Sequence, residues 1–155
     1  MKDVKTIKVT SDDLHDGIWD DSISNTDAGE NASPELSWES VEGAGEYVIY
    51  MIDEYDTDYW LHWRAYGIKE NSHDHGEEFA EDVFNEYVGP YPPEGIHEYV
   101  VYVFALKEHA SSYPGNFDAE SVNVEAVREG LDRAADGSDG NILAEGCISG
   151  TYAAV

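Results

Sequence analysis

Unbroken apolar runs and short alternating segments dominate the hydrophobic pattern of this chain. Residues 47–52 (YVIYMI) and 99–106 (YVVYVFAL) contain only β-branched, aromatic and other apolar side chains. Such runs are typical of strands that are buried on both faces. Residues 6–10 alternate between polar and apolar side chains, as a half-buried strand does. Further strands are predicted over residues 60–68 and, as a short return, over residues 142–152, so the pattern indicates a mainly β protein.

One segment near the C-terminal end follows a helical period instead. Its apolar side chains recur at spacings of three, four and three residues: Val124, Val127, Leu131 and Ala134. This spacing places them on one face of a helix that ends near Gly137, with Asp118 and Ser121 as candidate N-cap residues. Several strands and one late helix together indicate a mainly β sandwich.

The length and composition fit a single globular domain. The chain has 155 residues, of which 41% are hydrophobic, and this apolar content is enough for a packed core. We therefore expect residues 1–155 to form one domain. Its longest apolar run, residues 99–106, is far below the roughly 18 residues of a membrane span, and the N-terminal residues lack the apolar stretch of a signal peptide. We therefore expect a soluble, cytoplasmic protein without membrane insertion. Its single cysteine, Cys147, excludes an intramolecular disulfide and a multi-thiolate zinc site, and we expect it to be buried.

The charge excludes one large class of partners. Asp and Glu number 34 against 8 Lys and Arg, which gives a formal charge of −26. Proteins bind nucleic acids mainly through Lys and Arg, which release counterions from the phosphates. Nucleic acids and anionic membranes are therefore not expected partners. An acidic surface serves solubility, and a high-salt cytoplasm favours the same composition, so the charge identifies no positive partner.

Two segments carry candidate chemistry, and the first follows the apolar run at residues 47–52. Asp53 and Asp56 stand at the end of that predicted strand, and the sequence WLHW begins at Trp60. In an extended chain Trp60 and His62 point to the same face. This segment therefore places carboxylates, an indole ring and an imidazole close together.

The second segment is residues 89–99, with the sequence GPYPPEGIHEY. Gly89 and Pro90 begin a rigid, turning connection, and His97 and Tyr99 share one face of the strand that follows. The Gly and Pro residues are expected to shape a rigid loop with exposed backbone amides near Gly89. Together the two segments predict a compact polar pocket with both donors and acceptors.

In their order and spacing these segments resemble the phosphatidylethanolamine-binding protein family, in the bacterial and archaeal branch often called Raf-kinase-inhibitor-like. The resemblance runs from residues 33–38 (SPELSW) through 60–63 (WLHW) and 89–99 to the ending at residues 142–152 (ILAEGCISGTY). It implies a β-sandwich of two sheets with a short C-terminal helix. It also implies a small surface pocket for phosphate-like or other small anions, such as phospholipid headgroups, with no enzymatic activity and no cofactor.

The residues that the resemblance assigns to the ligand are Asp53, Asp56, Trp60, His62, Gly89, Pro90, His97 and Tyr99. Asp53 matches the first aspartate of the family's D-P-D-x-P motif, but both prolines are absent and the second aspartate appears one position late, as Asp56. Glu98 stands where the family usually has Arg, which removes a positive charge near the pocket. Asp53 repels an anion unless a histidine or the anion itself carries a proton. We therefore expect phosphate monoesters to bind weakly, and better near pH 6 than near pH 8. A small carboxylate is the other expected ligand.

A third pattern, residues 73–78 (HDHGEE), offers a different class of function. Two histidines one residue apart with a nearby carboxylate approach the metal motif of the cupins, which are β-barrel enzymes. The spacing to the carboxylates does not match that motif, so a solvated acidic loop is the simpler interpretation. A metal-dependent, cupin-like enzyme that uses His73 and His75 is the alternative.

Protein partners form the remaining alternative. The family name suggests modulation of a kinase, although no feature of this chain shows it. Tyr91 and Tyr113 are candidate exposed aromatic residues for the surface of a protein partner or a homodimer.

Overall fold

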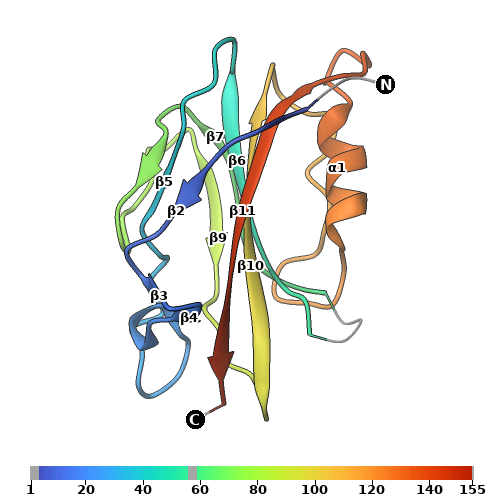
Figure 1. Ribbon diagram of the computed structural model, residues 1–155. Helices are drawn as coiled ribbons and strands as arrows, with labels where there is room; N and C mark the ends of the chain where they lie inside the picture. Colours follow the sequence, from blue (N-terminus) through green and yellow to red (C-terminus); the bar gives the residue numbers. More distant parts are fainter. Residues whose placement is uncertain (1–3, 56–58, 155) are drawn as a thin grey trace.

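The computed structural model describes residues 4–55 and 59–154, and its framework is two β-sheets (Figure 1). The eight-stranded sheet has the order β3 (Leu14–His15), β4 (Ile18–Trp19), β11 (Ile142–Ala153), β10 (Ile96–Leu106), β6 (Glu46–Asp53), β7 (Trp60–Ile68) and β9 (Phe84–Tyr87), with β1 (Lys5–Thr6) paired to β11. The three-stranded sheet has the order β2 (Val9–Thr10), β5 (Leu36–Trp38) and β8 (Ser72–His73). A short 3-10 helix spans Asp21–Ile23, and the helix α1 spans Val124–Asp132. The mainly β sandwich of two sheets with a short helix near the C-terminal end is confirmed.

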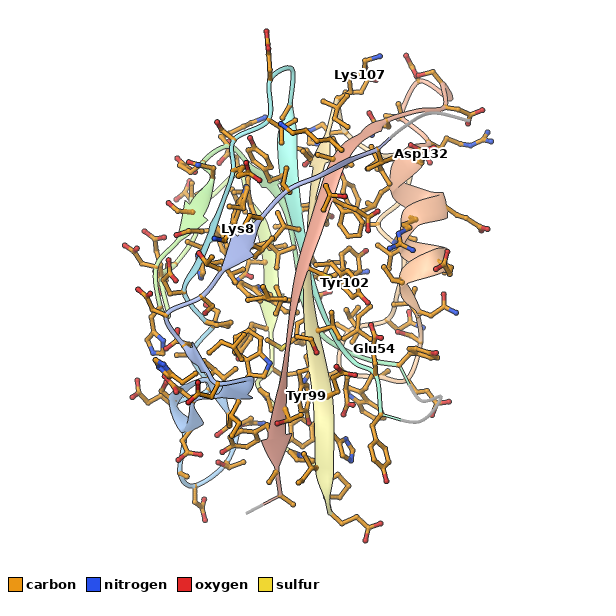
Figure 2. The ribbon with its side chains drawn as sticks, in the orientation of Figure 1. Lys8, Glu54, Tyr99, Tyr102, Lys107 and Asp132 are labelled. Carbon is orange, nitrogen blue, oxygen red and sulfur yellow. The ribbon has the colours of Figure 1, made fainter. Side chains whose placement is uncertain are left out.

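The large sheet is covered on both faces. Figure 1 shows the smaller sheet on one side of it and α1 on the other. One hydrophobic cluster fills the space between the two sheets, and a second lies between the large sheet and α1. Side chains occupy both spaces (Figure 2).

The strand β6 explains why its sequence shows no alternation. All of its residues are buried, and its apolar residues, 47–52, alternate between the two clusters. Ile49 and Met51 point toward the smaller sheet, whereas Tyr50 and Ile52 point toward α1. A strand with two covered faces requires apolar side chains at successive positions. The prediction of a strand buried on both faces is therefore confirmed.

Two strand predictions need correction. The tail forms the longest strand, β11, because it lies inside the large sheet, antiparallel to β10 and parallel to β1 and β4. The expected strand over residues 6–10 divides into β1 and β2, which belong to different sheets. The chain changes sheets after Ile7, whose N–H donates to the carbonyl of Glu145 on β11 at 3.1 Å.

The helix and the cysteine also differ from expectation. The N-cap is Asn123, whose Oδ1 accepts from the N–H of Ala126 at 3.0 Å, and not Asp118 or Ser121. The helix ends at Asp132, before the turn that contains Gly137. Cys147 is exposed, on β11 beside Tyr102 of β10, and not buried as expected. In the part of the chain that the structure describes, no helix has the length and apolar character needed to span a membrane.

Candidate ligand pocket

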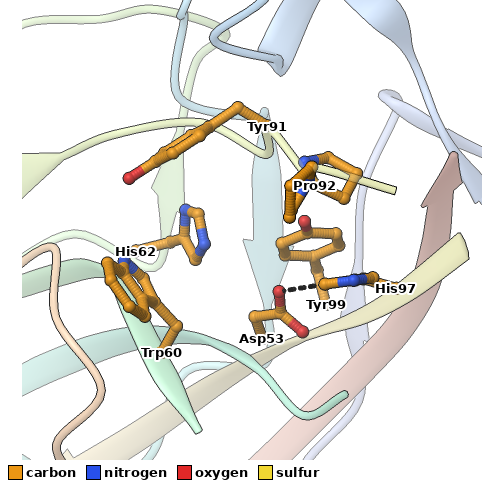
Figure 3. Close-up of a pocket in the computed structure, with 8 residues that line it drawn as sticks. Asp53, Trp60, His62, Tyr91, Pro92, His97 and Tyr99 are labelled. Carbon is orange, nitrogen blue, oxygen red and sulfur yellow. Dashed lines mark hydrogen bonds and ion pairs between the residues drawn. The ribbon is translucent and has the colours of Figure 1, made fainter. Parts of the chain in front are cut away.

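Strand pairing brings the predicted segments together at one end of the large sheet (Figure 3). Asp53, the last residue of β6, pairs with Tyr99 of β10 on one side and with Trp60 of β7 on the other. The three side chains therefore form a row across neighbouring strands, on the face toward the smaller sheet. Residues separated by up to 46 positions in the chain meet there because the register of the strands aligns them.

A β-bulge directs His62 toward the pocket. Leu61 pairs with Ile52 and Trp63 pairs with Met51, so His62 is the extra residue between them. Its ring meets the rings of Tyr91 and Tyr99 edge to face, with centroids 5.6 and 5.2 Å away. Sequence alternation predicted that His62 shares a face with Trp60, and both side chains line the pocket.

The hydrogen bond of His62 sets which of its nitrogens can receive a ligand. Its Nδ1 lies 2.8 Å from the carbonyl oxygen of Val88. A carbonyl only accepts, so Nδ1 carries the proton and Nε2 of the neutral ring is an acceptor. Burial lowers the pKa of His62, and the Val88 bond and the charge of Asp53 oppose this only in part. His62 therefore stays neutral as the pH falls toward its ordinary pKa.

Asp53 and His97 form a buried pair. Nδ1 of His97 donates to Oδ2 of Asp53 at 2.6 Å, and Oδ1 of Asp53 accepts from the N–H of Tyr55 at 2.9 Å. The ring of Tyr55 stacks on that of His97, with centroids 4.0 Å apart. These contacts hold the carboxylate and the imidazole in fixed orientations.

The hydroxyl of Tyr99 is buried and has no hydrogen-bond partner of good geometry among the described residues. Burial, reinforced by the negative charge of Asp53, raises the pKa of Tyr99 well above its ordinary value. The phenol therefore keeps its proton and remains available as a donor. Buried polar groups in folded proteins are nearly always paired, so an unpaired one beside a hollow marks a position where a ligand atom can bind.

These groups surround a hollow of about 260 Å³. The described residues that line it are Asp53, Trp60, His62, Tyr91, Pro92, Pro93, His97 and Tyr99. None of these is a Lys or Arg, so within this described lining the formal charges come from Asp53 and from any proton on a histidine. Sequence reasoning included Tyr91, Pro92 and Pro93 in the motif but did not assign them to the pocket. Asp56, also predicted to bind the ligand, lies outside the described residues.

Gly89 and Pro90 are not among the residues that line the hollow. The N–H of Gly89 donates to Oδ1 of Asn31 at 2.7 Å, so the amide expected to be exposed is already engaged. A Cβ at position 89 would lie 1.9 Å from the carbonyl oxygen of Ile23, and this close approach requires glycine. The carbonyl of Pro90 accepts from the N–H of Asn25 at 2.9 Å. Both residues therefore anchor the loop that carries Tyr91.

Glu98 has less influence on the pocket than expected. It lies between His97 and Tyr99 on β10, so its side chain points to the opposite face of the sheet. There it is exposed and its Oε2 accepts from the hydroxyl of Ser149 at 2.5 Å. The substitution of Glu for the family's Arg therefore leaves the walls of the hollow unchanged.

The two histidines of the cupin-like pattern separate in the structure. His73 is buried, with Nε2 2.8 Å from the hydroxyl of Ser33 and its ring stacked on Phe79. His75 is exposed, and its Nδ1 donates to Oδ2 of Asp13 at 2.9 Å. No group of three or more His, Cys, Asp and Glu side chains among the described residues could hold a metal ion. The cupin alternative is not favoured, and the solvated-loop interpretation is wrong for His73.

Comparisons with known proteins agree with this architecture. Residues 10–153 match the model of the phosphatidylethanolamine-binding protein family. The chain belongs to this family. Membership in the phosphatidylethanolamine-binding protein family supports a non-enzymatic binding protein in general.

Relatives of this family member occur in an archaeon and a bacterium. The chain is 29% identical over 140 residues to the UPF0098 protein of Methanothermobacter thermautotrophicus, a match that covers 80% of this chain and 84% of the relative. It is 27% identical over 139 residues to the UPF0098 protein of Chlamydia trachomatis, with the same coverage of 80% and 84%. A solved phosphatidylethanolamine-binding protein homolog from Chlamydia trachomatis has a TM-score of 0.66 and 21% identity, and covers 96% of this chain and 97% of that chain. This structural similarity shows that the chain and the Chlamydia trachomatis homolog share a fold.

Proposed function

We propose that this protein binds a small phosphate-like anion in the pocket, such as a phosphate monoester or a carboxylate of the size of a phospholipid headgroup. The observation that carries the proposal is the buried Tyr99 hydroxyl, which has no hydrogen-bond partner of good geometry in the described part of the chain and lies beside the Asp53–His97 pair. Leaving such a donor unpaired costs about 1–3 kcal/mol. An oxygen of the ligand that accepts from Tyr99 removes this cost.

The charge of the pocket selects the protonation state of the ligand. A phosphate dianion is repelled by Asp53, and no Lys or Arg among the described lining residues offsets the repulsion. A phosphate monoester has its second pKa near 6, so its monoanion carries one proton at lower pH. That proton can be donated to the Asp53 carboxylate or to Nε2 of His62. Binding therefore strengthens as the pH falls from about 8 to about 6.

The lining residues also support the absence of catalysis. The described wall contains no Ser, Thr, Cys or Lys, so its candidate nucleophiles are limited to its Asp, His and Tyr side chains. The carboxylate of Asp53 is engaged by His97 and by the N–H of Tyr55. We therefore propose a binding role for the site and no reaction.

NMR titration of the isotope-labelled protein with inorganic phosphate and with O-phosphoethanolamine, at pH 6 and pH 8, tests the proposal. Saturable shifts are expected at Asp53, His62, His97 and Tyr99, with tighter binding at pH 6. Tyr99→Phe is expected to weaken binding by about tenfold, because the ligand loses one donor. It is expected to change the thermal stability little, because among residues 4–55 and 59–154 the hydroxyl has no hydrogen-bond partner of good geometry.

Tyr102→Phe is the matched control for Tyr99→Phe. Tyr102 lies on the same strand, but Figure 2 shows it with Glu54 on the side of the sheet that carries α1, and its hydroxyl donates to the Glu54 carboxylate. Its variant is expected to bind the phosphate probes as the unmodified protein does. Absence of saturable shifts at both pH values contradicts the proposed function.

A further inference from the structure

Two aromatic walls of the pocket come from separate segments of the chain. Trp60 begins β7, and Tyr91 belongs to the loop that precedes β10. Figure 3 shows Trp60 and His62 on one side of the pocket and Tyr91 across another, with the Tyr91 hydroxyl directed toward Trp60 and His62 and away from His97. The distance between the Trp60 and Tyr91 side chains therefore determines how wide this part of the hollow is.

One carboxylate outside the hollow contacts both walls. Oδ1 of Asp118 accepts from the indole N–H of Trp60 at 2.9 Å and also from the hydroxyl of Tyr91. Asp118 lies in the segment before α1 and is not among the residues that line the hollow. One carboxylate oxygen atom, which lies outside the hollow, thus accepts hydrogen bonds from both walls.

The backbone of Asp118 is itself attached to the pocket strand. The N–H of Asp118 donates to the carbonyl of Leu61 at 2.9 Å, and the N–H of Leu61 donates to the carbonyl of Ala119 at 3.0 Å. Asp118 has φ of +53°, a left-handed conformation that Asp tolerates better than most residues. These bonds hold the carboxylate at a fixed place relative to β7, so it can act as a rigid support.

We propose that Asp118 is a positioning residue that joins Trp60 and Tyr91 and thereby sets the width of the pocket. The proposal rests on the proposed function of the same site. Asp118 acts on an anion in two opposite ways, because its bonds hold the walls in place while its charge repels the ligand. Burial and the bond to Asp118 raise the pKa of Tyr91 to about 12, so the Tyr91 donor persists throughout the physiological pH range.

Three variants separate the two actions of Asp118. Asp118→Ala removes the acceptor and the charge, whereas Asp118→Asn removes the charge but keeps an oxygen that can accept from both walls. Glu120→Gln is the matched control, because it removes one charge from an exposed position of the same segment. Each variant is titrated with inorganic phosphate at pH 6, and NMR records the indole N–H resonance of Trp60 and the pH titration of the Tyr91 ring.

Asp118→Ala is expected to bind phosphate about tenfold more weakly, to shift the Trp60 indole resonance and to lower the pKa of Tyr91. Asp118→Asn and Glu120→Gln are expected to bind as well as the unmodified protein or up to about twofold more tightly, because one repulsive charge is gone. Equal affinities of the Ala and Asn variants overturn the proposal, because they show that Asp118 acts through its charge alone. An unchanged Trp60 resonance in Asp118→Ala also overturns it.

A different experimental result would show that the proposed function is wrong. If the unmodified protein binds no phosphate probe at pH 6 or pH 8, the proposed function is wrong. The Trp60 resonance and the Tyr91 titration need no ligand, so in that case they still decide whether Asp118 joins the two walls.

Discussion

Two of the regions that place histidines beside carboxylates each adjoin a hollow, but among the described residues histidines line only the hollow of the first. The first is the pocket, with Asp53, His62, His97 and Tyr99. The second is the β8 turn, which we define as residues 73–78. In the pocket, three neighbouring strands bring side chains to one end of the large sheet. In the β8 turn, two histidines that are close in sequence contact different neighbours.

The contrast arises from how each segment leaves its strand. His73 and His75 would share a face if the strand continued, but β8 ends at His73 and the chain turns at Gly76, which has φ of +67°. His73 enters the core beside Trp63 and Phe79, and His75 turns outward to Asp13. Close spacing in the sequence therefore did not produce a site, whereas strand register assembled one from distant residues.

The largest expected effect is a loss of folding stability from a substitution in the β8 turn that leaves the pocket intact. His73→Ala removes a buried ring that packs against Trp63 and Phe79, and we expect the free energy of unfolding to fall by about 2–4 kcal/mol. Phosphate binding at pH 6 is expected to be unchanged. Urea unfolding and NMR titration measure the two quantities, and His15→Ala, at an exposed ring, is the control. Loss of phosphate binding with unchanged stability would place the functional site at the β8 turn.

The next expected effect tests the charge of the pocket. Asp53→Asn weakens the pairing with His97 and Tyr55, and we expect a loss of about 1–2 kcal/mol of stability. Removal of the carboxylate also removes its repulsion of a phosphate dianion. The ratio of the phosphate Kd at pH 8 to that at pH 6 is therefore expected to be smaller in Asp53→Asn than in the unmodified protein. An unchanged ratio in the same titrations contradicts the role that we give to Asp53.

The smallest expected effect concerns pH and the β8 turn. The hydrogen bond to Asp13 raises the pKa of His75, so the charged ring is favoured in the folded state. Its contribution to stability is full below the ordinary pKa of about 6.5 and is lost as the pH rises through the raised value. The ring is partly exposed and solvent screens the pair, so we expect only a few tenths of a kcal/mol.

Comparison of the unmodified protein with His75→Gln measures this contribution. The difference between their urea midpoints is expected to shrink between about pH 6 and pH 8. The contribution of the buried His73 to stability changes with pH in the opposite direction, because burial lowers the pKa of His73. This contribution is present above about pH 6.5 and is lost at lower pH. A difference that grows with rising pH contradicts the His75–Asp13 assignment.

Much of the fold followed from local patterns. The run of apolar residues at 47–52 identified β6, and β7 begins and ends where the sequence indicated. Alternation along each strand also placed Trp60 with His62, and His97 with Tyr99, on the sides that line the pocket. These predictions succeeded because the two-residue period of a strand is a local property of the backbone.

Long-range pairing was needed for the rest. The apolar tail could be recognised as a strand, but its place inside the large sheet depends on hydrogen bonds to β10 and β1. The same is true of the bulge at His62 and of the close approach that requires glycine at position 89. No sequence signal identified Asp118 as a partner of Trp60 and Tyr91, because these three residues meet only after the segment before α1 bonds to β7.

By itself, the sequence determined the strands, the two-sided burial of the central ones and the residue types that the pocket contains. Burial and alternation depend on each residue and its near neighbours, so the linear pattern records them. Only the tertiary structure decided which polar atoms face the hollow, that the Tyr99 hydroxyl lacks a well-oriented hydrogen-bond partner among the described residues, and that His73 and His75 separate. Those outcomes depend on strand register and on contacts between distant segments, and no local pattern encodes either one.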